Sequence, residues 1–96
     1  MDRKEGGMSE ETTQTWLVER SYGQTEDLVT LVYATKDGKR HVKQQLSHQM
    51  LFDKEITAGR TVQVDRLERV ADEATHERYH EEAVRMVENH DPDEAV

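Results

Sequence analysis

An almost wholly apolar segment, Leu28–Ala34, limits the folds open to this chain. Six of its seven residues are apolar, in a sequence of 96 residues of which only 33% are hydrophobic. β-Branched and aromatic residues favour strands, and an apolar run without alternation is typical of a strand that is covered on both faces. We therefore expect this segment to be the central strand of a sheet.

Strand patterns lie on both sides of this segment. Gln14–Tyr22 alternates aromatic and β-branched residues with other side chains, which predicts a strand. The pair Asp37-Gly38 predicts a hairpin, because glycine accepts the positive φ of tight turns, and a third strand is expected from Lys39 to Leu46. A fourth is expected over Arg60–Leu67, and residues 47–59 fit either a strand or a loop.

A helix is predicted near the C-terminal end of the sequence. Asp72 is a suitable N-cap, Glu73 lies in the first turn, and Pro92 follows shortly after the periodic pattern ends at His90. The predicted helix has an apolar face and an opposite charged face, formed respectively by Tyr79, Ala83, Met86 and Val87, and by Glu77, Glu81, Arg85 and Glu88. This amphipathic pattern predicts that the helix lies across the sheet.

These elements predict an α+β fold, with a three- to four-stranded antiparallel meander sheet and one C-terminal amphipathic helix packed on one face. We expect a flexible tail at residues 1–13, one domain at residues 14–90, and an acidic, disordered tail at residues 91–96. A chain of 96 residues has room for one domain with a small core. Oligomerisation would compensate for that small core.

Acidic residues are concentrated at one end of the chain. Residues 71–96 hold nine acids and two bases, which gives −7 of the total net charge of −8. Surplus carboxylate, with eight arginines against five lysines, is typical of proteins adapted to concentrated salt, and an ordinary acidic protein is the alternative. Because the chain lacks cysteine and any membrane-spanning apolar run, we expect a cytoplasmic protein that does not interact with membranes.

Residues 76–80 read H-E-x-x-H and fall on the predicted helix. Histidines four residues apart share a helix face and can ligate zinc, with Glu77 as general base, in a zinc-binding protein or metal-dependent hydrolase. A third ligand would have to come from the sheet, where His41 and His48 are candidates. We favour the structural interpretation, in which His76 packs on the sheet and His80 lies at its edge.

The predicted hairpin is basic. Its cations, Lys36, Lys39, Arg40 and Lys43, could bind the phosphates of a nucleic acid, and Trp16 or Tyr33 could stack on a base. The net charge of −8 opposes this unless the acidic helix faces away. A lysine-rich turn also protects a sheet edge from pairing with other chains, and we favour that interpretation.

A protein interface is the third candidate site. One helix covers one face of the sheet, so some apolar residues lack evident cover: Trp16, Leu17, Tyr22, Leu28, Leu31, Leu51 and Phe52. An open sheet face or edge readily forms a two-fold dimer. The alternative is that residues 47–59 fold over this face.

Three stretches of the sequence resemble a small haloarchaeal protein family with no assigned function. They are WLVERSY at residues 16–22, DLVTLVYATKDG at residues 27–38, and YHEEAVRMVENHDPDE at residues 79–94. The resemblance extends over residues 14–94 and implies a halophilic, cytoplasmic protein. It implies no active site and no role for any residue.

The sequence therefore favours a small, non-catalytic interaction or structural module that needs no cofactor. Its expected partner is a second copy of itself or another protein. Metal-dependent hydrolysis through His76 and His80, and nucleic-acid binding through the hairpin, are the alternatives.

Overall fold

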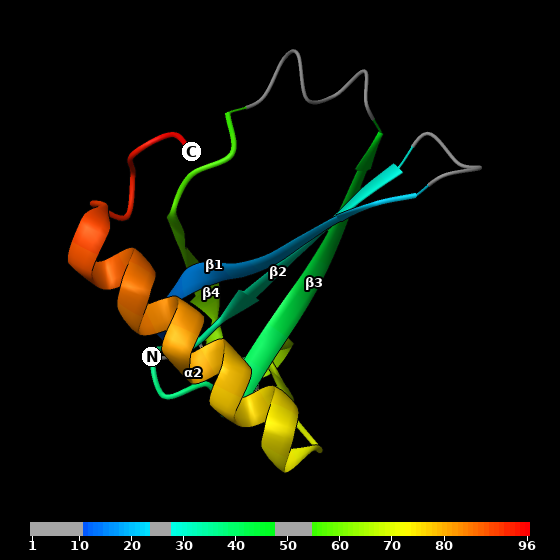
Figure 1. Ribbon diagram of the computed structural model, residues 1–96, viewed down its shortest axis with the longest axis vertical. Coiled ribbons are helices and arrows are strands. Elements are labelled where there is room, and N and C mark those ends of the chain that lie inside the picture. Colours follow the sequence, from blue (N-terminus) through cyan, green and yellow to red (C-terminus); the bar gives the residue numbers. More distant parts are fainter. Residues whose placement is uncertain (1–10, 24–27, 48–54) are drawn as a thin grey trace, which may run out of the picture.

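The computed structural model describes residues 11–23, 28–47 and 55–96 of the chain. The elements, in chain order, are β1 (Thr12–Tyr22), β2 (Leu28–Ala34), β3 (Arg40–Ser47), β4 (Gly59–Gln63), the 3-10 helix η2 (Val64–Arg66), β5 (Glu68–Arg69) and α2 (Glu73–Asn89). The strands form one antiparallel sheet, and α2 lies across one of its faces (Figure 1). The predicted α+β class with a C-terminal helix is confirmed.

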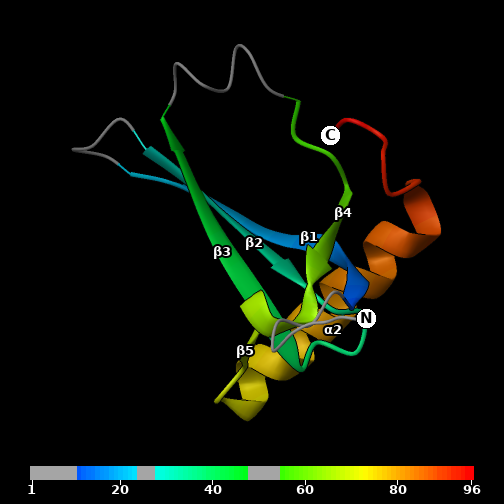
Figure 2. The ribbon, with the colours of Figure 1, turned by 180° about the vertical axis from the view of Figure 1, so that it is seen from behind.

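The sheet has five strands in the order β4-β1-β2-β3-β5, so the prediction of three to four strands was wrong. The segment β1-β2-β3 forms the expected meander, with β2 in the centre. In contrast, β4 pairs with the far edge of β1, and the two-residue β5 pairs with β3 (Figure 2). The predicted fourth strand ends early, at Gln63, because η2 follows it and turns the chain toward β3.

Both faces of β2 are buried, as its apolar sequence predicts. Val32 and Ala34 face α2 and form one cluster with Trp16, Val18, Tyr79 and Ala83. Leu31 and Tyr33 point to the other face and form a second cluster with Leu17, Val29 and Leu46. The sheet is thus the middle layer between two small apolar clusters; α2 covers the first, and only its Met86 also packs against the second.

Helix α2 begins and ends as predicted. The Asp72 carboxylate accepts hydrogen bonds from the backbone N–H of Thr75 at 2.8 Å and from its hydroxyl at 2.7 Å, and these bonds lower the pKa of Asp72. At the other end, His90 is the C-cap, and its N–H donates to the Met86 carbonyl. Tyr79 and Ala83 are buried, while Met86 and Val87 pack against the same cluster, so the predicted apolar face is confirmed.

Residues 91–96, for which we expected a disordered end, lie along residues 56–59. The backbone N–H groups of Ala58 and Gly59 donate to the carbonyls of Glu94 and Pro92, both at 2.8 Å. The Val96 N–H donates to the Ile56 carbonyl at 2.9 Å. The chain end therefore lies beside the start of β4, where Figure 1 places it. At the other end of the chain, β1 begins at Thr12, two residues before the expected start of the domain.

The described residues on the face opposite α2 are covered by the chain itself. Ile56 packs against this cluster, and the Tyr33 hydroxyl donates to the Thr57 carbonyl at 2.9 Å. Arg60 places its guanidinium 5.5 Å from the centre of the Tyr33 ring. Of the residues expected to lack cover, Leu17 and Leu31 are buried here, Trp16 lies under α2, and Leu51 and Phe52 lie outside the described residues.

Candidate functional site

The turn between β2 and β3 rests directly on the backbone of α2. Gly38 has a φ of 77°, and a Cβ atom added to it would lie 2.5 Å from the His76 carbonyl oxygen and 2.6 Å from the His80 nitrogen. Only glycine meets both requirements, the left-handed backbone and the absence of a side chain. The Asp37-Gly38 pair thus forms the predicted hairpin and also the contact between hairpin and helix.

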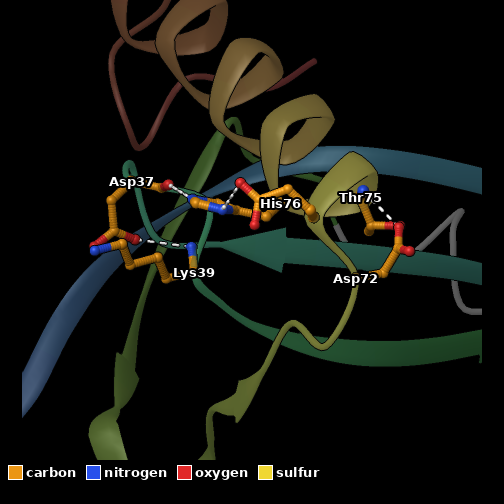
Figure 3. A network of polar contacts seen from close by, with 6 residues as sticks. Asp37, Lys39, Asp72, Thr75 and His76 are labelled. Carbon is orange, nitrogen blue, oxygen red and sulfur yellow. Dashed lines mark hydrogen bonds and ion pairs between the residues drawn. The ribbon is translucent and has the colours of Figure 1, made fainter.

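Both histidines of the H-E-x-x-H match bind this turn. The Nε2 atom of His76 lies 2.9 Å from the Asp37 carbonyl oxygen (Figure 3), and the Nδ1 atom of His80 lies 2.7 Å from the Lys36 carbonyl oxygen. A carbonyl oxygen only accepts, so both ring nitrogens carry a hydrogen and donate it. These two nitrogens therefore cannot bind a metal ion, and only Nδ1 of His76 and Nε2 of His80 keep a lone pair.

The other possible metal ligands do not gather around these histidines. The remaining ring nitrogen of His76 lies 3.9 Å from the Glu73 carboxylate. His41 lies on β3 with its ring centre 6.0 Å from that of Tyr79, and His48 is outside the described residues. Within residues 11–23, 28–47 and 55–96, no three His, Cys, Asp or Glu side chains come together as a metal site would need.

Hydrogen bonds inside the turn fix its shape. The Asp37 carboxylate accepts from the Thr35 hydroxyl at 2.6 Å and from the Lys39 N–H at 2.9 Å, the second of which Figure 3 shows. Partial burial alone would raise the pKa of Asp37. The two hydrogen bonds and the positive charges of Lys39 and His76 outweigh burial and lower it. The ionised carboxylate is therefore part of the turn.

The basic residues proposed for nucleic-acid binding lie on and beside this turn. Lys36, Lys39, Arg40 and Lys43 are all exposed. The turn touches the first half of the acidic helix, so the acidic helix does not face away from it. Trp16 and Tyr33, the expected stacking partners, are 8% and 1% exposed, so neither ring is accessible to a base.

A second cluster of polar side chains lines an open hollow between α2 and β3, with a volume of ≈320 Å³. We call it the α2–β3 cleft. Its polar lining is Glu19, His41, Lys43, Asp72, Thr75, Arg78 and Tyr79. Sequence reasoning missed this cleft because its residues come from β1, β3 and α2. The sequence signal that could have indicated the cleft is the alternation of side chains along β3, which places His41 and Lys43 on the same face of the sheet.

Charge interactions organise one side of the α2–β3 cleft. Arg78 forms an ion pair with Glu19 at 3.1 Å, and its guanidinium lies 5.2 Å from the centre of the Tyr79 ring. Burial and the negative charge of Glu19 raise the pKa of Tyr79, so its hydroxyl stays protonated at neutral pH. The Nδ1 atom of His41 is buried and has no hydrogen-bond partner among the described residues.

Among the described residues, the outer edge of β3 is paired over only part of its length. On one side, β3 pairs with β2 along its whole length, from Leu28↔Ser47 to Ala34↔His41. On the other side, the described pairing stops after Arg40↔Arg69 and His41↔Glu68. Within the described parts of the chain, no strand pairs with the outer side of residues 42–46.

The direction of the backbone groups in β3 follows from the hairpin. Thr35 donates its N–H to the Arg40 carbonyl, so these two residues form a hydrogen-bonded pair. Such pairs alternate along an antiparallel ladder, so residues 42, 44 and 46 bond to β2. Lys43 and Gln45 therefore direct their N–H and C=O groups outward, to the open side of β3.

Comparison with known proteins identifies a family but no function. A family model described as a family of unknown function, DUF7967, matches residues 9–96. No curated protein and no solved structure is significantly similar to this chain. Among the described residues, no helix has both the length and the apolar character that crossing a bilayer requires. The match spans the whole described sheet and helix, and the chain belongs to the DUF7967 family.

Proposed function

We propose that this chain is a non-catalytic interaction module that forms a homodimer by pairing the outer edges of two β3 strands. The observation that supports this most is the outer edge of residues 42–46, where none of the described strands pairs and Lys43 and Gln45 direct backbone groups outward. Of the cations expected to protect this edge, only Lys43 lies within residues 42–46, so this segment can accept a further strand through main-chain hydrogen bonds. Pairing with a second copy extends the five-stranded sheet across two chains.

An edge is a better candidate than a face of the sheet. The clusters on both faces are buried within the chain. Of the described large apolar residues, only Tyr22 and Val96 are exposed, at 56% and 41%, and they form no extended patch. A face-to-face dimer would need an exposed apolar patch, whereas an edge pair needs mainly free backbone groups.

One register suits two antiparallel β3 strands. With the two-fold axis at Gln44, Lys43 pairs with Gln45 of the second copy, and each such pair exchanges two backbone hydrogen bonds. The same register sets Val42 opposite Leu46 of the second copy and places no two like charges opposite each other. The paired segment is short, so we expect a dimer that dissociates on dilution.

Charge makes this dimer dependent on salt. Two chains with a net charge of −8 repel each other, and salt screens that repulsion over a Debye length of about 3 Å at 1 M. β3 itself carries Arg40 and Lys43 and no acid. We therefore propose that the module works in the concentrated salt of a haloarchaeal cytoplasm, where its association is strongest.

Sedimentation velocity on three proteins tests the proposal. Gln45→Pro removes an outward N–H while leaving the bonds to β2 in place, because proline is tolerated where an edge strand faces solvent. Gln45→Ala keeps that N–H and is the matched control. We expect the natural chain and Gln45→Ala to associate as concentration rises in about 2 M salt, and Gln45→Pro to stay monomeric with an unchanged circular dichroism spectrum.

Two results would contradict the proposal. One is a natural chain that remains monomeric at all concentrations and salt levels. The other is a Gln45→Pro variant that associates as strongly as the natural chain does, since its edge can no longer complete the hydrogen-bonded pairs.

A further inference from the structure

The α2–β3 cleft contains a buried polar atom without a partner. The Nδ1 atom of His41 makes no hydrogen bond to any described residue. The backbone of His41 is held on both sides, by Ala34 of β2 and Glu68 of β5, and its ring lies 6.0 Å from that of Tyr79. Buried polar atoms in folded proteins almost always have a partner, which a bound molecule or water supplies when the protein does not.

The acidic groups that face the cleft are already engaged. Glu19 binds the Arg78 guanidinium at 3.1 Å and also contacts the Tyr79 hydroxyl. Asp72 accepts two hydrogen bonds from Thr75 as the helix cap. Neither carboxylate is therefore available to a ligand without the loss of a contact that holds the fold.

The cationic groups of the cleft retain free donors. Lys43 is exposed and makes no ion pair with any described residue. Arg78 uses one terminal nitrogen for Glu19, while its side chain stays 55% exposed, so other N–H groups of its guanidinium face solvent. Lys43 comes from β3 and Arg78 from α2, so the two cations flank the cleft from different elements.

We infer that the α2–β3 cleft binds a small molecule through an oxyanion group, either a phosphate or a carboxylate. Lys43 and Arg78 supply the positive charge, and the side chain of His41 forms part of the cleft wall. The volume of ≈320 Å³ lies at the lower end of the range of ligand sites, roughly 300–1,000 Å³. A ligand of a few carbon atoms, or inorganic phosphate itself, matches that volume.

The N-terminus of α2 is not the binding element. Its Thr75 N–H already donates to the Asp72 side chain. The helix dipole adds only a favourable potential for an anion beside the first turn. The site depends on side chains from β3 and α2, which makes it testable by substitution.

NMR titration at constant ionic strength tests this inference, with inorganic phosphate in one arm, acetate in a second, and chloride as the reference. We expect saturable shifts at His41, Lys43, Arg78 and Tyr79 with phosphate, acetate, or both, and the responding arm identifies the oxyanion. Lys43→Gln should weaken binding at least about tenfold, as the loss of one charged contact does. Lys36→Gln removes an exposed lysine of the turn, outside the cleft, and should leave the affinity unchanged.

Three outcomes would overturn the inference. The shifts in both arms could rise linearly with concentration, without saturation. They could spread over all basic residues of the turn rather than concentrate at the cleft. Alternatively, Lys43→Gln could bind as tightly as the natural chain while its spectrum shows an intact fold. None of these outcomes depends on the β3 dimer, which Gln45→Pro tests separately.

Discussion

Gly38 and His80 approach so closely that a Cβ atom added to Gly38 would lie 2.6 Å from the backbone nitrogen of His80. The contact joins the β2–β3 turn to the first half of α2, across more than 40 residues of sequence. It explains why the helix lies at its observed place on the sheet. The turn and the helix form one structural unit, which the two histidine hydrogen bonds complete.

Replacing Gly38 with alanine should destabilise the protein by about 2–4 kcal/mol. The added methyl group would have to fit a φ of 77° and a backbone oxygen at 2.5 Å. Lys36→Ala in the same turn changes only an exposed side chain and should stay within about 0.5 kcal/mol of the natural chain. Urea unfolding of both variants measures the difference, and equal stability would contradict the docking of the turn.

The turn, the helix and the β1-β2-β3 meander could be predicted from sequence, whereas the positions of β4 and β5 in the sheet could not. The Asp37-Gly38 turn and the Asp72 cap depend on residues that are close in sequence. A short segment of the sequence is therefore enough to predict each of them. The position of β4 beside β1, by contrast, depends on which edge the chain reaches after residues 55–58. The alternation of apolar and polar residues indicates which face of a strand is buried. It does not indicate which other strands pair with that strand.

The candidate sites show the same division. The spacing of His76 and His80 correctly placed both on one side of α2, yet their partners are carbonyls of a turn that lies about 40 residues away in sequence. Backbone carbonyls have no sequence signature. The α2–β3 cleft brings together Glu19, Lys43 and Arg78, and only the fold determines that these three residues meet.

His76→Ala and His80→Ala should each lower the free energy of unfolding by about 1 kcal/mol, the typical net value of one hydrogen bond. Each substitution removes the donor to one turn carbonyl. Glu77→Gln changes the glutamate of the H-E-x-x-H match, which is exposed, and should have no effect. Chemical denaturation of the three variants provides this comparison.

Zinc should not raise the melting temperature of the untagged protein. His76 and His80 each keep one ring nitrogen with a lone pair, but the described residues supply no group of three metal ligands. Calorimetry with one equivalent of zinc tests this prediction. A rise in melting temperature that disappears in His76→Ala would show that the histidines bind metal instead.

Stability should fall at acidic pH partly because of Asp37. Despite the burial that would raise its pKa, hydrogen bonds and nearby positive charge lower the pKa of Asp37 in the folded protein. The ionised Asp37 therefore stabilises the fold fully above the pKa that Asp37 has in the unfolded chain. This stabilisation is lost as pH falls through the lower pKa of Asp37 in the folded protein. Asp37→Asn keeps the acceptor oxygen but cannot ionise, so its stability should change less between about pH 5 and 2.

Thermal unfolding of the natural chain and Asp37→Asn across this pH range measures the difference. Asp72 has a lowered pKa for a similar reason and adds to the acid sensitivity of both proteins. Identical pH profiles for the two proteins would contradict the role of the ionised Asp37 carboxylate in the turn.

Amide hydrogen exchange at Lys43 and Gln45, followed by NMR over a range of protein concentrations, tests the β3 dimer most directly. Both N–H groups face outward in the single chain, so they should exchange fast when dilute and become protected as concentration and salt rise. Residue 44 bonds to β2 and should be protected throughout. Exchange at Lys43 and Gln45 that stays fast at every concentration would contradict pairing through this edge.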